Sequence, residues 1–359
     1  MWKLVILSWF ISTHGYAQDY IPKMIDALTQ KFDTEFLQGV GGAAGIVYKG
    51  KVVYKKVFGH EYLNGPPISE DTYFPIGSVS KPITALVIAD LMAEKKLSLA
   101  TELKRAIPQA PLGIQVYNLL SHSSGFIFKA NPLIEQGRSR EFLVEELLRR
   151  GTKKQDFLYS NLVFSLLEDI VAHETRDTWP NVFHQTLKKR GLGHLAIGTL
   201  PADAPVAYPH AKRRNKFVTL GRFPKNYPQL VSSSAGVFAS LKDLLQFAQM
   251  QFSPEFEFLH QPRISAKDVF YWGIHFPVPE AKIKASYALG WRVFEHVKDT
   301  GLSTRLVYHG GSLNGLSAFV GFMKNPDLAV VVVRNDDQRF SSNTGIDMWT
   351  AYLKSASLI

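Results

Sequence analysis

Residues 74–92, FPIGSVSKPITALVIADLM, place a serine and a lysine directly before a long apolar run. Ser78 and Lys81 are three positions apart, so on a helix their side chains share one face, with Cβ atoms about 5–6 Å apart. A lysine can take the proton of a serine hydroxyl when burial or a neighbouring cation lowers the pKa of its ammonium group. The alternative is a helix-capping serine followed by a solvated lysine, and this stretch alone leaves both interpretations open.

Two later segments carry polar residues of the kinds found in enzyme sites. Tyr159 and Asn161 stand directly before the helix-like run at 162–174. A tyrosine flanked by cations can act as a base, and an asparagine amide can hold a carbonyl group. The strand-like run 304–308 ends in residues 309–312, HGGS, where glycines allow a ligand to approach the backbone closely. Taken singly, the first segment is equally a capped helix with a packed tyrosine, and the second a bulge or turn.

Taken in order, Ser-x-x-Lys, Tyr-x-Asn and His-x-Gly resemble the motif set of the serine β-lactamase and penicillin-binding protein superfamily. The resemblance is strongest to its class C β-lactamase-related branch of serine hydrolases. It extends from about residue 20 to residue 355, and the surrounding sequence agrees with it at several points. These are LLSHSSGF at 119–126, FLYSNLVFSLLEDIVAHE at 157–174, SSSAGVFASLKDLLQFAQM at 232–250 and HGGSLNGLSAFVGF at 309–322.

The resemblance implies roles for particular residues in an acyl-enzyme mechanism. Ser78 would be the acylated nucleophile and Lys81 its proton partner, while Tyr159 would activate the serine and then the deacylating water. Asn161 would hold the acyl amide, and the backbone N–H groups of Ser78 and Ser312 would form the oxyanion hole. No metal and no organic cofactor are implied.

The strand motif departs from the class C pattern at two positions. Where those enzymes carry a lysine that opens a Lys-Thr-Gly motif, this chain has His309, and Gly310 replaces the threonine before Gly311. A histidine is mostly uncharged at neutral pH. A charge pair at about 4 Å contributes roughly 1–4 kcal/mol between water-like and surface-like dielectrics. The resemblance implies that His309, Gly310, Gly311 and Ser312 bind substrate, and we expect the histidine to capture a substrate carboxylate less strongly than a lysine would.

Several functions remain open on this basis. The leading hypothesis is a serine hydrolase for amide or ester bonds, either an envelope D-amino-acid peptidase of the carboxypeptidase type or a β-lactamase-like hydrolase. Alternatives are an esterase on the same fold and a non-catalytic protein that binds peptidoglycan or peptides. The sequence contains neither Gly-x-Ser-x-Gly nor His-Glu-x-x-His, which argues against an α/β-hydrolase and a zinc hydrolase.

The expected fold is α/β (α+β), an antiparallel sheet flanked by helices with an inserted, mainly helical lobe. We expect one catalytic domain over 18–359, with the sheet region at 18–97 and 232–359 and the lobe at about 98–231. Residues 199–230 are rich in proline and basic residues and predict a long surface loop. Short connections between strand-like runs favour antiparallel pairing. These runs are a hairpin at 42–59 and strands at 286–297, which we expect to be irregular at its start, and at 304–311, 316–323 and 328–336.

The first residues have the layout of an export signal. Lys3 precedes an eight-residue apolar run, and small residues at Gly15 and Ala17 favour cleavage after position 17. No other run is long enough to span a bilayer, so we expect an exported, periplasmic or secreted bacterial protein with no integral membrane span after cleavage. The chain has no cysteine and a net charge of +10, yet it shows no nucleic-acid recognition signature. The expected partner is a small-molecule or peptide substrate, and no nucleic acid.

Overall fold

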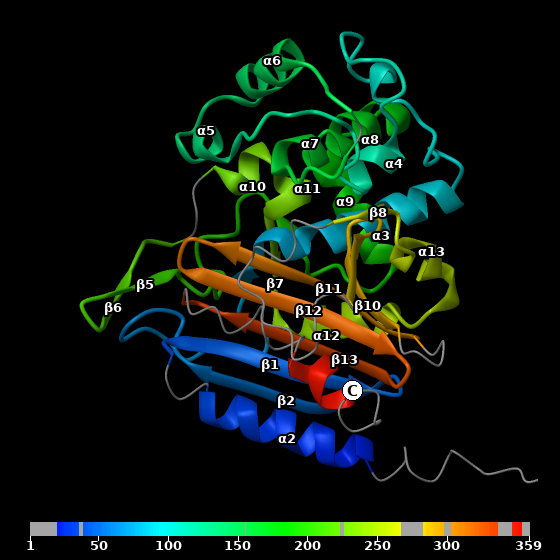
Figure 1. The fold of residues 1–359 in the computed structure, drawn as a ribbon. Coiled ribbons are helices and arrows are strands. Elements are labelled where there is room, and N and C mark those ends of the chain that lie inside the picture. Colours follow the sequence, from blue (N-terminus) through cyan, green and yellow to red (C-terminus); the bar gives the residue numbers. More distant parts are fainter. Residues whose placement is uncertain are drawn as a thin grey trace, which may run out of the picture.

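Strands from both ends of the described chain form one eight-stranded antiparallel sheet (Figure 1). The structure, a computed structural model, describes residues 20–35, 39–154, 156–222, 226–266, 283–297, 303–336 and 347–353. The export segment expected at 1–17 lies outside these residues. The strand order is β2 (Lys51–Gly59), β1 (Gly41–Tyr48), β13 (Asp327–Arg334), β12 (Leu316–Lys324), β11 (Ser303–Leu313), β10 (Arg292–Val297), β9 (Ile283–Tyr287) and β8 (Ile264–Ser265).

The predicted hairpin at 42–59 is confirmed, and its turn chemistry explains the tight connection. Lys49 and Gly50 link β1 to β2 with φ angles of 48° and 72°. A two-residue hairpin turn with two positive φ angles matches the right-handed twist of the strands. The pairing of β1 with β13 joins the first strand of the sheet to the last one along the chain, and it places Gly45 opposite Val331.

The valine run 330–333 shows why this sheet needs cover on both faces. Val330 and Val332 pack into one hydrophobic cluster, whereas Val331 and Val333 pack into another. Because side chains alternate along a strand, one run of apolar residues serves both faces. A central strand buried on both sides is the result.

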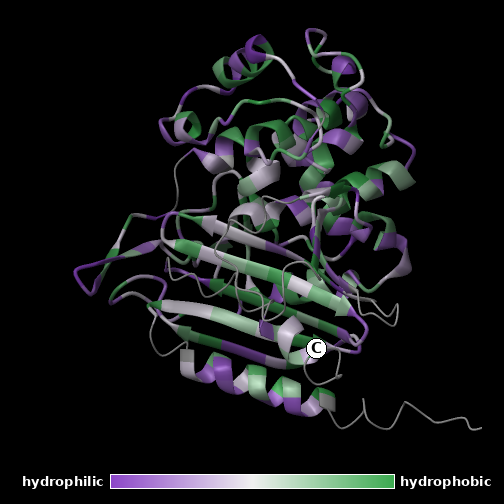
Figure 2. Ribbon diagram, viewed as in Figure 1, coloured by the Kyte–Doolittle hydropathy of each residue, from purple (hydrophilic) through white to green (hydrophobic). Residues whose placement is uncertain are grey.

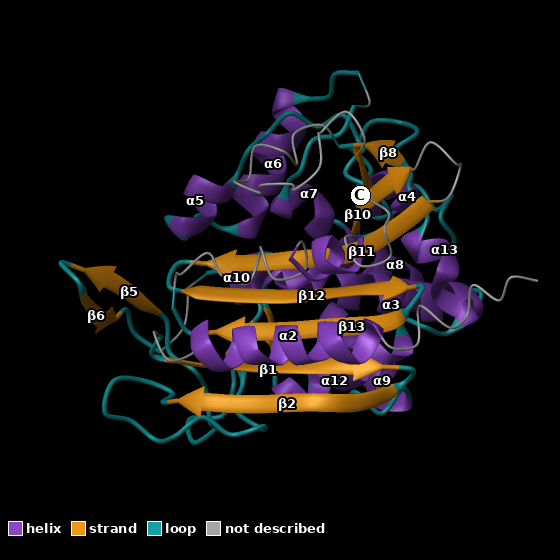
Figure 3. Cartoon of the chain, turned by 60° about the horizontal axis from the view of Figure 1, so that its bottom comes forward, coloured by secondary structure: helices purple, strands orange, loops and turns teal. Residues whose placement is uncertain are grey.

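Different helices cover the two faces (Figure 3). On one face lies α2 (Tyr20–Glu35), which Figure 2 shows with hydrophobic and hydrophilic residues alternating along it, together with helical residues 347–353. The opposite face packs against α12 (Leu241–Met250) and α3 (Ser80–Ala93). Helix α3 is buried from Ser80 to Leu91, so it lies inside the protein between the sheet and the helical lobe. None of the helices in the described ranges has both the length and the apolar character needed to cross a bilayer.

The helical lobe stands beside one edge of the sheet, around the first turns of α3 (Figure 1). Its helices are short because turns and capping residues interrupt the sequence repeatedly. Ser139, Ser160 and Thr178 each accept a hydrogen bond from a backbone N–H in the first turn of the helix that follows. The helices of the lobe are α4 (Val116–Leu120), α5 (Asn131–Glu135), α6 (Arg140–Arg150), α7 (Asn161–Ser165), α8 (Leu167–Thr175), α9 (Trp179–Lys189), α10 (Tyr227–Leu230) and α11 (Ser232–Ala235).

Two sequence predictions are wrong in detail. The strand expected at 286–297 with an irregular start is confirmed over β10, but its first residues belong to a separate strand, β9, and Gly290, whose φ is 79°, breaks the extended backbone between the two. The loop expected at 199–230 contains a hairpin of β5 (His210–Arg213) and β6 (Lys216–Thr219). This hairpin was missed because both strands are largely exposed, so they lack the alternation of apolar and polar residues that marks a half-buried strand.

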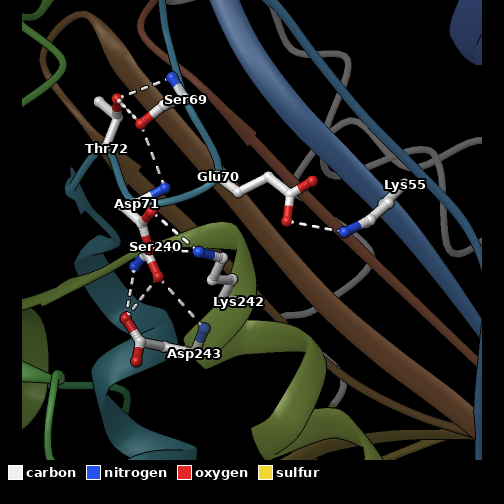
Figure 4. Close-up of polar contacts among 8 residues, drawn as sticks. All are labelled: Lys55, Ser69, Glu70, Asp71, Thr72, Ser240, Lys242 and Asp243. Atoms are coloured by element: carbon white, nitrogen blue, oxygen red, sulfur yellow. Dashed lines mark hydrogen bonds and ion pairs between the residues drawn. The ribbon is translucent and has the colours of Figure 1, made fainter.

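A surface corner fixes α12 to the loop that precedes β3 (Phe74–Pro75), and we call it the Lys242 corner (Figure 4). Its helix end is a capping box in which Ser240 Oγ accepts from Asp243 N–H and the Asp243 carboxylate accepts from Ser240 N–H. Two ion pairs complete it, Lys242 with Asp71 at 2.8 Å and Lys55 with Glu70 at 2.8 Å.

Candidate active site

Ser78 lies in a short 3-10 turn, η2 (Gly77–Val79), that leads into α3. Gly77 has a φ of 51°, a backbone angle that glycine adopts without the strain a side chain would add. The residue that caps α3 is Val79, so Ser78 does not fill the capping position. The neighbouring Ser80 instead joins backbone segments, since its hydroxyl donates to Gly77 O and accepts from Val237 N–H. The turn leaves the Ser78 hydroxyl at the mouth of a cleft.

Lys81 is buried, with 0% of its surface exposed, which excludes a solvated lysine. Its Nζ lies 3.2 Å from Ser78 Oγ, and it donates to Asn161 Oδ1 at 2.6 Å and to Ser234 O at 2.8 Å. Burial lowers the pKa of Lys81 well below its usual value, and the positive charge of Arg292 lowers it further. An uncharged amine has two N–H donors and one lone pair. With both donors used by Asn161 and Ser234, the lone pair is available to the Ser78 hydroxyl.

Tyr159 approaches the same hydroxyl from the helical lobe. Its Oη lies 2.7 Å from Ser78 Oγ, and Lys81 Nζ stands 4.5 Å from the centre of its ring. Burial raises the pKa of Tyr159, while the charge of Arg292 and the hydrogen bonds that Tyr159 makes with Ser78 and Arg292 act in the opposite direction. The balance keeps the phenol protonated at neutral pH, so Tyr159 is placed to donate a proton.

Asn161 connects Lys81 to the wall of the cleft. It is the first residue of α7, and Ser160 caps that helix by accepting from Val163 N–H. Its Oδ1 accepts from Lys81, and its Nδ2 donates to Asn131 Oδ1 at 3.2 Å. The amide is therefore fixed in orientation by partners on both sides.

The backbone of β11 touches the turn that carries Ser78. A Cβ atom added at Gly311 would lie 1.9 Å from Ile76 O and 3.2 Å from Ser78 N, so only glycine fits there. A Cβ atom added at Gly77 would lie 3.1 Å from Ser312 N. The two segments are thus in direct contact, and the backbone amides of Ser78 and Ser312 come from adjacent sides of this contact.

His309 lies behind the cleft and is fully buried. Its Nε2 is 3.0 Å from Tyr287 Oη, and its Nδ1 is 2.8 Å from Gly310 O. Burial lowers the pKa of His309 well below its usual value, and the charges of Arg292 and Lys81 lower it further. The histidine expected to bind substrate is thus absent from the lining of the cleft and uncharged, whereas a Cβ atom added at Gly310 would meet open space.

Three residues of this region were not assigned a role from the sequence. His122 packs its ring 4.4 Å from the ring of Tyr159, Tyr287 contacts His309, and Arg292 lies 5.7 Å from the Tyr159 ring centre. Only Arg292 left a signal, since an arginine within the apolar run ALGWRVF is unusual for a buried strand. We use the name buried cluster for Lys81, His122, Tyr159, Tyr287, Arg292 and His309.

A cleft of about 770 Å³ opens in front of Ser78. Its lining is mostly amide and hydroxyl groups, and within the described lining Glu135 is the one charged residue. The described residues contain no group of three histidine, cysteine, aspartate or glutamate side chains that could hold a metal ion. The lining consists of Ser78, Asn131, Glu135, Asn161, Asn226, Tyr227, Ala235, Ser312, Leu313, Asn314 and Gly315.

Comparisons with known proteins identify a family and several relatives. The model of the beta-lactamase family matches residues 29–351. A D-aminopeptidase of Cereibacter sphaeroides is 25% identical over 341 residues, covering 89% of this chain and 60% of that protein. The chain therefore spans about three fifths of the length of this relative.

Two solved structures share the fold. An octameric penicillin-binding protein homologue from Pyrococcus abyssi superposes with a TM-score of 0.74 at 21% identity, covering 93% of this chain and 77% of that one. A class C beta lactamase from Rhodobacter sphaeroides gives a TM-score of 0.71 at 18% identity, covering 92% of this chain and 99% of that one. The expected antiparallel sheet with flanking helices is confirmed.

Proposed function

The chain belongs to the beta-lactamase family, and we propose that it is a serine hydrolase that acts through an acyl-enzyme formed on Ser78. One observation carries this proposal. The Ser78 hydroxyl faces the cleft with Lys81 Nζ at 3.2 Å and Tyr159 Oη at 2.7 Å. A nucleophile, a base and an acid within hydrogen-bond reach are the parts that acyl transfer needs.

Acylation follows from the protonation states of the three groups. The Lys81 amine takes the proton of Ser78, and Oγ forms a bond to the substrate carbonyl carbon. The oxygen of the tetrahedral intermediate takes up the negative charge between the N–H groups of Ser78 and Ser312. When the bond to the leaving group breaks, Tyr159 donates its proton to that group, and the proton held by Lys81 replaces it. Asn161 holds the acyl amide beside this site.

Deacylation repeats the same steps with water as the nucleophile. The water passes one proton to Lys81 through the Tyr159 hydroxyl, which accepts one proton and gives up its own, and the water oxygen attacks the acyl carbon. The bond from that carbon to Ser78 Oγ then breaks, and the serine recovers a proton. The product is a carboxylic acid, and the enzyme returns to its starting state.

The charges of the cleft support an amine-bearing substrate. No lysine, arginine or charged histidine is present among the described lining residues, so a substrate carboxylate has no cation to pair with there. Glu135 instead offers a carboxylate to an ammonium group. Together with the D-aminopeptidase relative, this favours amides and peptides with a free amino-terminal D-residue over penicillins and peptides with a free carboxyl terminus. The signal-like residues 1–17 support action outside the cytoplasm.

Four substrates and one variant test the proposal. Purified protein is incubated with p-nitrophenyl acetate, D-alanine p-nitroanilide, N-acetyl-D-alanyl-D-alanine and benzylpenicillin, and hydrolysis and intact mass are followed. We expect hydrolysis of the first two, faster turnover of the anilide than of either carboxylate substrate, and an acyl adduct that is absent from Ser78→Ala.

Each part of the proposal has its own contrary result. Hydrolysis that persists in Ser78→Ala would remove the acyl-enzyme mechanism. If benzylpenicillin is turned over faster than the anilide, the proposed substrate class is wrong, whereas the acyl-enzyme mechanism is not contradicted.

A further inference from the structure

Arg292 is a buried cation at the start of β10, at the edge of the buried cluster. The strand register places it opposite Tyr287 on β9 and Tyr308 on β11. Only 6% of its surface is exposed, so it does not reach the cleft as a substrate-binding group. A charged side chain at such a position is costly unless hydrogen bonds hold it and its charge has a use.

The guanidinium reaches across β11 toward the reacting groups. It hydrogen-bonds the hydroxyl group of Tyr159, its charge acts on the neighbouring Tyr308, and its Cζ is 5.7 Å from the centre of the Tyr159 ring. Arginine suits this position because its guanidinium donates hydrogen bonds in a fixed geometry while its charge stays fixed. One side chain thereby orients the Tyr159 hydroxyl and keeps a positive charge behind it.

No other fixed charge in the described part of the chain faces Tyr159. Both neighbouring histidines are uncharged, because burial lowers the pKa of His122 and of His309 well below the usual value. Lys81 is the group that gains and loses a proton. The titratable and charged groups that face Tyr159 and Arg292 come from α3, the segment after α4, β9 and β11, and they are Lys81, His122, Tyr287, Tyr308 and His309.

We propose that Arg292 is a positioning residue that sets the pH at which Lys81 and Tyr159 become competent for proton transfer, an inference that rests on the proposed function. Its charge opposes a second positive charge on Lys81 and favours negative charge on the Tyr159 oxygen. Its hydrogen bond directs that oxygen toward Ser78. Acid–base catalysis on this site therefore depends on a residue that contacts neither substrate nor nucleophile.

Three variants separate the charge of Arg292 from its hydrogen bonds. Arg292→Met removes both, Arg292→Gln keeps a donor without the charge, and Arg292→Lys keeps the charge. The pH dependence of kcat/KM for p-nitrophenyl acetate is measured for each variant from pH 5 to pH 10. Arg305→Met is the matched control, because Arg305 on β11 pairs with Glu295 on β10 and with Gln261, which precedes β8, and none of these residues belongs to the buried cluster.

The direction of the shift follows from the charge. Without the cation, Lys81 and Tyr159 both hold their protons to higher pH, so both limbs of the profile move upward. We expect a shift of about one pH unit or more in Arg292→Met and Arg292→Gln, with a loss of about tenfold at pH 7 that shrinks toward pH 9. The pH profile of Arg292→Lys should shift by less than half as much, and Arg305→Met should keep the wild-type profile.

The contrary results are equally distinct. A loss of activity of the same size at every pH, with both limbs unmoved, would show a purely structural role for Arg292 and overturn the inference. If Arg292→Met does not fold, Arg292→Gln and Arg292→Lys still decide the point, and their melting temperatures show that the comparison is between folded proteins. Wild-type protein without any Ser78-dependent hydrolysis would instead refute the proposed function.

Discussion

Two lysines, Lys242 in the surface corner of Figure 4 and Lys81 in the buried cluster, have opposite surroundings. Lys242 exposes 56% of its side chain and pairs with Asp71 at 2.8 Å, and this partner raises its pKa. Lys81 is fully buried, faces neutral oxygens and lies near a second cation, and burial lowers its pKa well below the usual value. The same side chain is therefore kept charged at one position and made able to lose its proton at the other.

The difference shows what each region is built for. An exposed ion pair can be lost at small cost, because water solvates both partners once they separate. Water cannot compensate for a lost partner in this way in the buried cluster, where each charged or titratable group affects the protonation of its neighbours. Substitutions should therefore change activity strongly in the buried cluster and hardly at all in the Lys242 corner.

The largest effect is expected from removal of the buried amine. In Lys81→Met the Ser78 hydroxyl loses its base, and we expect kcat/KM for p-nitrophenyl acetate to fall by about 10⁴-fold or more, as when one member of a catalytic unit is deleted. Single-turnover acylation measured by intact mass checks this. An activity within tenfold of wild type would end the comparison, since Lys81 would then be a structural residue like Lys242.

Packing against η2 offers the next test. Gly311→Ala would force a Cβ atom against Ile76 O and push β11 away from Ser78, so we expect a loss of about 10²-fold in kcat/KM. Gly310→Ala is the matched control, because its added Cβ atom meets nothing within 4 Å and activity should stay within about threefold. Equal losses in both variants would mean that contact with η2 is not what residue 311 provides.

Stability should respond to pH in opposite directions at the two lysines. Unfolded chains hold the Lys81 proton up to about pH 10.5, whereas the folded protein releases it at lower pH, so unfolding takes up a proton. The free energy of unfolding should therefore rise with pH, by at most about 1.4 kcal/mol per pH unit from this one group. The contribution of Lys242 has the opposite sign. Its ion pair with Asp71 stabilises the fold at pH values below the pKa of Lys242 in the unfolded chain. This stabilisation is lost as the pH rises through the higher pKa of Lys242 in the folded protein.

Urea titrations between pH 7 and pH 10 measure this dependence. The slope of stability against pH should be steeper in wild type than in Lys81→Met. Identical slopes would mean that Lys81 keeps its proton in the folded protein.

The smallest effect is expected at the surface. Lys242→Met should leave kcat/KM within twofold and lower the melting temperature by about 2 °C or less, because an exposed pair contributes little. Differential scanning fluorimetry beside the esterase assay checks both. A large loss of activity would show that the Lys242 corner affects the active site, and it would contradict the expectation that the two regions act independently.

The sequence predicted those parts of the site that depend on local spacing. Ser78 and Lys81 share a face because a helical turn fixes their separation, and Tyr159 and Asn161 stand together at the start of α7. The two-residue turn at Lys49 and Gly50 was likewise readable, because it needs a particular chemistry.

What remained hidden depends on contacts between distant segments. Arg292 meets Tyr159 only through the register of β10 with β11, and the ring of His309 turns away from the cleft because its Nε2 hydrogen-bonds the Tyr287 hydroxyl on β9. A motif places a residue in the chain, but it does not say which way the side chain points. The sequence shows a glycine at position 290, but the apolar residues on both sides of it are typical of one continuous strand, so the break between β9 and β10 was not predicted.

The pairing of β1 with β13 has a consequence for how the molecule comes into being. Gly42 lies opposite Arg334, so strands 334 − 42 = 292 positions apart must meet before the sheet closes. Contacts of such long range form late and slowly. A chain that emerges amino terminus first presents Ser78 and Lys81 long before β11 and β13 exist to enclose them. During synthesis the site is therefore incomplete until β11 has formed, and the edge of β1 stays unpaired, as a template for association with other chains, until β13 has been made.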